Sequence, residues 1–269
     1  MKDSWSQRVA RARQLGQGDG PSAALLSSYA DLLALQHASF ESLKKSGPPS
    51  GSLERDLPAV REQVPPLLRA IAEKGPERLA MEATALLDDY ARHAAHNGHD
   101  GAAIDQLLLA YWHTPSDQNF FGKAALQPYA SWLAESGIDP LDRPMKRADN
   151  RCPFCSGRPQ LSILVAASES DGGGRQLLCA TCLTVWPFRR VVCVYCGEED
   201  ERKTGYFHTP AFDHLRLDAC ESCKHYLKTV DLTKLGLAVP LVDEVAGAPL
   251  DLWARERGYE KIELNLLGL

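Results

Sequence analysis

All eight cysteines of this 269-residue chain occur in four Cys-x-x-Cys pairs, and all of them lie between residues 152 and 223. The first two pairs are separated by 23 residues, and so are the last two. Shifting the first four cysteines by 41 positions gives the other four, so the pattern is a tandem repeat of a four-thiolate site. The pairs are Cys152/Cys155, Cys179/Cys182, Cys193/Cys196 and Cys220/Cys223.

This spacing is typical of metal binding. Two residues between cysteines allow a tight backbone turn, called a knuckle below, and two knuckles supply four thiolates in a tetrahedron. Such a ligand set suits zinc or iron, and it has no open position for a substrate. We therefore expect two mononuclear metal ions with a structural role. The expected ligands of one ion are Cys152, Cys155, Cys179 and Cys182, and those of the other are Cys193, Cys196, Cys220 and Cys223.

Other uses of the cysteines stay open at this point. Interleaved ligation, as in cross-brace domains, would group them differently. Disulfides are disfavoured because nothing in the sequence indicates secretion, and thioredoxin-like chemistry generally uses one Cys-x-x-Cys motif in a βαβ setting. An iron–sulfur cluster on four thiolates is also compatible with the residue types. The spacers favour single ions, because each has the length of a β-hairpin.

The spacers between the paired knuckles predict strands. In the first, Gln160–Ala167 is apolar and β-branched, Ser168–Gly174 is a polar glycine-rich turn, and Arg175–Leu178 leads back to a cysteine. In the second, Thr204–His208 and His214–Asp218 flank a short turn. Each half of the repeat is therefore expected to form one metal ribbon.

The cysteine-free first half is predicted to be helical. Apolar residues recur at helical spacing, and proline, glycine and capping residues mark the boundaries. We expect helices at Ser22–Lys45, at Leu53–Lys74 with an interruption near Pro65-Pro66, from Pro76 through Tyr90, at Ala102–Trp112, and from the N-cap Thr114 to Gly137.

The fold class predicted from these elements is α+β. An N-terminal helical domain (1–148) ends in the charged, proline-containing linker Asp139–Asn150 and precedes two tandem rubredoxin-like or zinc-ribbon modules (149–190 and 191–232). Lys228–Leu269 is expected to begin with a strand-like segment, and residues 233–269 are expected to be a C-terminal helical tail. This tail forms one helix at about Val242–Arg257, packed on the ribbons.

Charge and motif content argue against several functions. The formal net charge is −5, and neither half is basic: Lys+Arg against Asp+Glu is 16 to 19 through Asn150 and 14 to 16 after it. This disfavours nucleic-acid binding. No apolar run of membrane-spanning length and no secretory signal is found, so we expect a cytoplasmic protein without membrane insertion. No nucleotide-binding loop or nucleophile elbow is found, so no enzyme activity is expected.

Six histidines could in principle add metal ligands. The first three are close in sequence, but Asn97-Gly98 ends the helix between them, so a polar helix end is expected. The other three fall in the second ribbon, where four cysteines already complete a site. These histidines are His93, His96, His99, His208, His214 and His225.

The residues around the cysteines resemble the FdhE family of formate dehydrogenase accessory proteins. The resemblance covers mainly residues 151–259, and Gln127-Pro128 extends it weakly into the first half. Ser156 and Lys224 depart from it, because they stand where ribbons often place glycine. The matching segments are Cys152-Pro-Phe-Cys155, Cys179-Ala-Thr-Cys182 with Trp186, Cys193-Val-Tyr-Cys196-Gly197, and Cys220-Glu-Ser-Cys223 with Tyr226-Leu227-Lys228.

The resemblance implies an assembly factor rather than an enzyme. Members are cytoplasmic, are needed to form active formate dehydrogenase, and are thought to bind its catalytic subunit before export. Their sites look rubredoxin-like and iron-binding, although spacing alone does not separate iron from zinc. The alternatives are a zinc-ribbon adaptor for nucleic acid or transcription machinery and a rubredoxin-like redox or oxygen-sensing protein. Weak self-association is left open.

Overall fold

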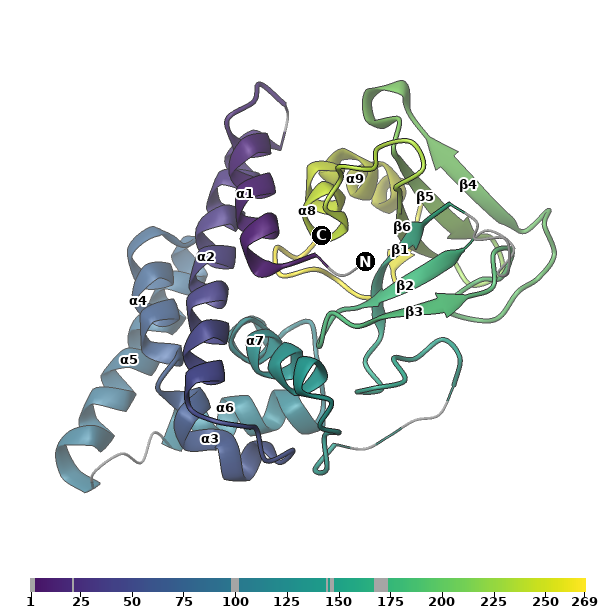
Figure 1. Cartoon of the computed structure of the whole chain (residues 1–269). Coiled ribbons are helices and arrows are strands. Elements are labelled where there is room, and N and C mark those ends of the chain that lie inside the picture. The colour runs from purple at the N-terminus through teal and green to yellow at the C-terminus, as the bar shows by residue number, and fades with distance from the viewer. Residues whose placement is uncertain (1–2, 21, 98–101, 144, 146–147, 167–173) are drawn as a thin grey trace. The chain divides into compact units, whose positions relative to one another are not determined.

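The computed structural model describes residues 3–20, 22–97, 102–143, 145, 148–166 and 174–269, with the backbone alone for 94–97 and 102. The chain divides into two compact units. Residues 35–145 form the helical unit, and residues 1–34 together with 146–269 form the sheet unit. The architecture is α+β, as predicted (Figure 1). The division into four domains at residues 148, 190 and 232 stays a prediction.

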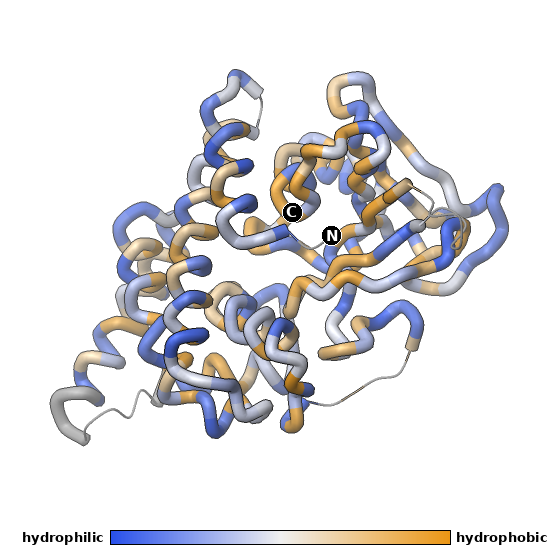
Figure 2. The backbone as a smooth tube through the Cα atoms, viewed as in Figure 1, coloured by the Kyte–Doolittle hydropathy of each residue, from blue (hydrophilic) through white to orange (hydrophobic). Residues whose placement is uncertain are grey.

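The helical unit is an all-α arrangement around buried aromatic side chains. Trp112 and Tyr129 are fully buried and meet edge to face, with 5.4 Å between ring centroids. Figure 2 shows hydrophilic and hydrophobic residues interspersed along α4 and α5, as expected for helices that bury one face. The helices of the helical unit are the second part of α2 (Ala23–Lys45), α3 (Leu53–Arg61), α4 (Val64–Lys74), α5 (Glu77–Asn97), α6 (Ala102–His113) and α7 (Phe120–Ser136).

The start of α7 differs from the sequence-based expectation. The predicted N-cap Thr114 is wrong, because the helix begins at Phe120 and its cap is Asn119. The Asn119 side chain accepts a hydrogen bond from the backbone N–H of Gly122 at 2.8 Å, which satisfies one of the free donors of the first turn. The predicted end at Gly137 is confirmed by a left-handed φ of 66°.

The sheet unit contains one seven-stranded sheet that both ribbons share. Each ribbon supplies an antiparallel hairpin, β1/β2 and β4/β5, as predicted. A parallel pairing between β1 and β6 joins the hairpins, and the strand order is β3-β2-β1-β6-β5-β4 with β7 beside β6. The turn predicted at 168–174 lies, except for Gly174, outside the described residues. The strands are β1 (Pro159–Leu164), β2 (Arg175–Cys179), β3 (Val185–Phe188), β4 (Thr204–His208), β5 (Leu215–Cys220), β6 (His225–Asp231) and β7 (Glu260–Lys261).

The C-terminal segment covers one side of this sheet with two short helices, α8 (Pro240–Ala246) and α9 (Ala248–Glu256) (Figure 1). The single helix expected here is wrong. Pro249 has no N–H to continue the hydrogen-bond ladder. Gly247 packs closely on strand β5, because a Cβ there would lie 2.7 Å from Leu215 Cδ1 and the leucine side chain would have to shift. Helix α1 (Trp5–Gly16) also belongs to this unit and contacts α8 through an ion pair between Arg11 and Asp243.

A buried group of four charges fixes these helices to the strands. Lys228 on β6 and Lys261 on β7 both contact Glu244 on α8 and Asp251 on α9, and all four side chains are 0 % exposed. Burial alone would raise the pKa of Glu244, but the two lysines outweigh it and hold that pKa at about 2. The Tyr226 hydroxyl donates to Asp251 at 2.8 Å. The sequence marked Lys228 only by its position after the last knuckle. In the structure it is a buried lysine paired with two carboxylates.

Candidate metal centres

The eight cysteines gather into two separate groups of four, and within each group the sulfur atoms lie within 4.8 Å of one another. The grouping is sequential rather than interleaved. The first centre consists of Cys152, Cys155, Cys179 and Cys182, and the second centre consists of Cys193, Cys196, Cys220 and Cys223.

The sulfur spacing fits a single ion in each centre. The Sγ atoms of Cys155 and Cys179 are 3.4 Å apart, and those of Cys193 and Cys223 are 3.7 Å apart. Four sulfurs at about 2.3 Å from a central ion would be about 3.8 Å apart in a tetrahedron, whereas a disulfide requires about 2.05 Å. None of the eight cysteines forms a disulfide. Each centre could hold zinc or iron, since both accept four thiolates.

All four knuckles use the same backbone turn. The residue after the second cysteine has a left-handed φ in every case, at 57° for Ser156, Leu183 and Lys224 and at 77° for Gly197. In three knuckles, an N–H from that residue reaches the carbonyl of the first cysteine at 2.9 Å. The turn therefore forms even where the expected glycine is missing.

The first centre is closed to solvent. Its four cysteines are at most 1 % exposed. Gly157 packs directly on the sulfurs, because a Cβ there would lie 2.7 Å from Cys179 Sγ and 3.2 Å from Cys155 Sγ. The Thr184 hydroxyl lies 3.2 Å from Cys182 Sγ. Burial raises the pKa of the Cys182 thiol, so a cation is needed to hold this centre as thiolates.

The second centre is partly open. Cys196 is exposed, Cys193 and Cys223 are half-buried, and only Cys220 is buried. A cavity of about 380 Å³ adjoins the centre. Its wall includes Cys193, Cys220, Arg175, Arg190, Arg216 and Tyr206.

Among the described residues, no histidine is part of either cysteine group. His225 contacts the carbonyl oxygen of Cys223 through Nδ1 at 2.8 Å and stacks on Tyr195. His214 contacts Asp243 at 3.0 Å, and His208 is exposed. His93 pairs with the backbone carbonyl of Asp89, whereas His99 and the side chain of His96 lie outside the described residues.

One residue that supports the centres was missed from sequence. Arg175, which is 4 % exposed, donates to Asp218 at 3.0 Å and to the carbonyl of Val192 at 3.1 Å. It thus connects the first ribbon to a strand of the second and to the residue before Cys193. Burial lowers the pKa of Arg175, and Asp218 opposes that shift. The sequence did offer an indication: Arg175 lies in a predicted strand, where its side chain shares a face with those of Leu177 and Cys179.

Comparison with known proteins points to one family. Residues 191–267 match the family described as "FdhE, C-terminal domain". The protein FdhE homolog of Aquifex aeolicus is 36 % identical over 149 residues, which cover 55 % of this chain and 51 % of that protein. The match thus spans about half the length of the Aquifex protein. The FdhE homolog of Pseudomonas putida is 28 % identical over 97 % of this chain and 86 % of its own length.

A solved structure supports the same relationship over the whole fold. The crystal structure of the FdhE protein from Pseudomonas aeruginosa aligns with a TM-score of 0.64 and 26 % identity, covering 99 % of this chain and 97 % of that one.

Among the described residues, no helix combines the length and apolar character that crossing a bilayer requires.

Proposed function

Since the chain belongs to the FdhE family, we propose that it is an accessory protein for the formation of active formate dehydrogenase. In this proposal it binds the catalytic subunit of that enzyme in the cytoplasm, before export. The observation that carries the proposal is the pair of four-cysteine centres, set in a fold that aligns over 99 % of its length with the FdhE protein of Pseudomonas aeruginosa.

The proposed ligands are the eight cysteines, with one ion in each centre and iron as the metal that the family resemblance favours. Four sulfurs around one ion leave no open coordination position for a substrate. We therefore assign the metals to stabilising the ribbons, and we assign no catalytic residue. A small module that builds little core of its own gains folding free energy directly from bound metal.

The accessory function is tested in the native host. Deleting the gene is expected to abolish formate dehydrogenase activity, and expressing this chain is expected to restore it. A Cys155→Ser variant should fail to restore it, whereas Lys45→Ala, an exposed change in the cysteine-free unit, should behave as wild type. Undiminished formate dehydrogenase activity in the deletion strain would contradict the proposal.

The two alternative functions predict other outcomes. A nucleic-acid adaptor would bind nucleic acid with an affinity that falls steeply with salt. A redox protein would carry iron whose visible absorption bleaches reversibly on reduction. Metal analysis with a visible spectrum, on protein purified anaerobically from the native host, separates zinc from iron, and two ions from a cluster.

A further inference from the structure

We propose that the two centres have different roles toward their metal: the first retains its ion and releases it slowly, and the second is an exchange site. Soft sulfur- or nitrogen-donor ligands from solution, such as small thiols, would reach the second centre at Cys196. In exchange, each metal–sulfur bond that breaks is replaced by a bond from the metal to the incoming donor atom, and the freed thiolate takes a proton from water. This inference goes beyond the accessory function and rests only on the proposed metal binding.

The two hairpins differ in their position in the sheet. The β1/β2 hairpin lies between β3, the edge strand of the same ribbon, and β6, and every residue of β1 is buried. The second ribbon ends the sheet with β4, whose residues are exposed except for Thr204, which is half-buried. The cysteine that ends each hairpin, Cys179 or Cys220, is buried in both ribbons, and the two centres differ in solvent access at their other cysteines.

Equivalent positions of the 41-residue repeat close the first centre and leave the second open. Gly157 has no side chain and packs on the sulfurs of the first centre. Its equivalent is Glu198, whose carboxylate accepts a hydrogen bond from Ser222 at 2.5 Å. The position equivalent to Thr184 is occupied by His225, whose Nδ1 contacts the carbonyl oxygen of Cys223 at 2.8 Å.

A stacked ring pair holds the two knuckles of the second centre together. Tyr195 lies between Cys193 and Cys196, and His225 follows Cys223; their rings are nearly parallel, with centroids 3.5 Å apart. The equivalent residues of the first centre are Phe154 and Thr184, which cannot form such a stack. The Tyr195–His225 stack is therefore a clamp whose opening would release the second ion.

The adjoining cavity provides the route. It is large enough for a small ligand, at about 380 Å³, and Cys193 and Cys220 line it, whereas no cysteine of the first centre does. A ligand in this cavity would lie beside Cys193 and Cys220, whereas Cys196 is reached directly from solvent.

Metal release from the 269-residue chain loaded with two zinc ions tests the inference. With excess 4-(2-pyridylazo)resorcinol as the chelator, we expect two phases of one ion each. The slow phase should be slower by about tenfold or more, because release from the first centre requires local opening of the sheet. Tyr195→Ala should accelerate the fast phase alone, and the matched change Phe154→Ala should leave that phase unchanged.

Cysteine labelling supplies a second readout that needs no variant. Brief treatment of the zinc-loaded chain with N-ethylmaleimide, followed by mass-spectrometric mapping, should modify Cys196 first and the first centre last. Equal release rates for the two ions, or early labelling of Cys152, Cys155, Cys179 or Cys182, would overturn the inference. A chain that binds no zinc would instead contradict the metal centres themselves, whereas equal release rates or early labelling of the first centre would leave the proposed role in formate dehydrogenase formation intact.

Discussion

At the scale of single residues, the metal knuckles depend on backbone conformation as much as on sulfur. Each knuckle needs one left-handed residue after its second cysteine, and three of the four use a residue other than glycine. For an L-residue this conformation costs roughly 1–2 kcal/mol. The chain tolerates the cost because the surrounding strands and the metal ligands fix the turn. Ser156 and Lys224 are thus departures from the glycine pattern in residue type and not in geometry.

Lys224 offers a test of this strain. Lys224→Ala and Lys224→Gly both remove its exposed ion pair with Glu221, but only glycine relieves the φ of 57°. We expect the glycine variant to have the higher free energy of unfolding, by about 1 kcal/mol. Denaturant unfolding of the metal-loaded variants measures the difference. An alanine variant as stable as the glycine variant would show that the turn carries no strain.

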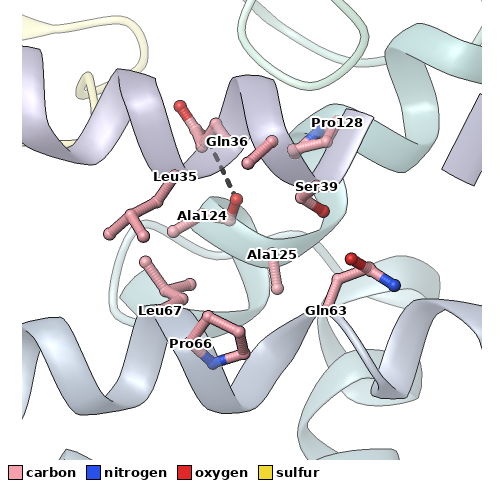
Figure 3. A pocket seen from close by; sticks show the side chains of 10 residues that line it. Leu35, Gln36, Ser39, Gln63, Pro66, Leu67, Ala124, Ala125 and Pro128 are labelled. Atoms are coloured by element: carbon pink, nitrogen blue, oxygen red, sulfur yellow. Dashed lines mark hydrogen bonds between the residues drawn. The ribbon is translucent and has the colours of Figure 1, made fainter. Parts of the chain in front are cut away.

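At the scale of secondary-structure elements, helix α7 contains an internal proline that a distant side chain compensates. Pro128 cannot donate to the carbonyl of Ala124, one turn earlier. The buried side chain of Gln36, on α2, donates to that carbonyl instead, at 2.8 Å, and Figure 3 shows this bond beside Pro128. The segment Gln127-Pro128, which was noted in the sequence, therefore depends on Gln36, a residue that lies far from it along the chain.

This pairing predicts a coupled effect on stability. Gln36→Leu should lower the free energy of unfolding by about 1–3 kcal/mol, because it leaves a buried carbonyl without a donor. With Pro128→Ala in place, the backbone N–H at position 128 can donate to the Ala124 carbonyl. Gln36→Leu should then lower the free energy of unfolding by less. Gln63→Leu, at a half-buried glutamine near the same helices, is the control with little effect. A double-mutant cycle measured by urea unfolding tests this. If the effects of Gln36→Leu and Pro128→Ala on the free energy of unfolding simply add, Gln36 does not compensate for the proline.

The buried charges between the strands and the last helices make a second prediction at this scale. Lys228→Met should lower the free energy of unfolding by about 3–5 kcal/mol, since it leaves Glu244 and Asp251 with one buried cation instead of two. Lys234→Met breaks the exposed pair with Asp213 and should change stability by less than about 1 kcal/mol. Equal losses of stability for the two variants in urea unfolding would contradict the role of burial.

Sequence alone predicted the elements whose causes are local. The cysteine spacing, the two hairpins, most helices and the left-handed end at Gly137 follow from neighbouring residues. The predicted start of α7 at Thr114 failed because the side chain of Asn119 caps the helix instead, through contacts with the backbone of Leu107 and Gly122. The shared sheet and the bridge made by Arg175 depend on residues far apart in sequence. No local pattern encodes these contacts.

At the scale of the whole molecule, the cysteines belong to one compact unit and the other unit contains none. Metal should therefore stabilise the two units unequally. A thiolate-bound ion contributes on the order of 10 kcal/mol to the folding of a small module. The helical unit rests instead on its buried aromatic and aliphatic core.

Metal removal tests this division. After both ions are chelated under reducing conditions, amide hydrogen exchange should speed up across residues 175–231, while protection within 53–74 and 120–136 should persist. Mass spectrometry of peptides from the loaded and metal-free chain measures both regions in one experiment. Loss of protection in both regions together would show that the metal-containing unit also holds the helical unit in its fold.

Association with the catalytic subunit of formate dehydrogenase tests the account most directly. The tagged, metal-loaded chain would be recovered from anaerobic extracts of its native host, and the catalytic subunit would be quantified by mass spectrometry. We predict enrichment of that subunit over a bait that carries Cys179→Ser and Cys220→Ser, one substitution in each centre. Recovery of the intact, metal-loaded chain without any enrichment of the catalytic subunit would contradict the proposed function.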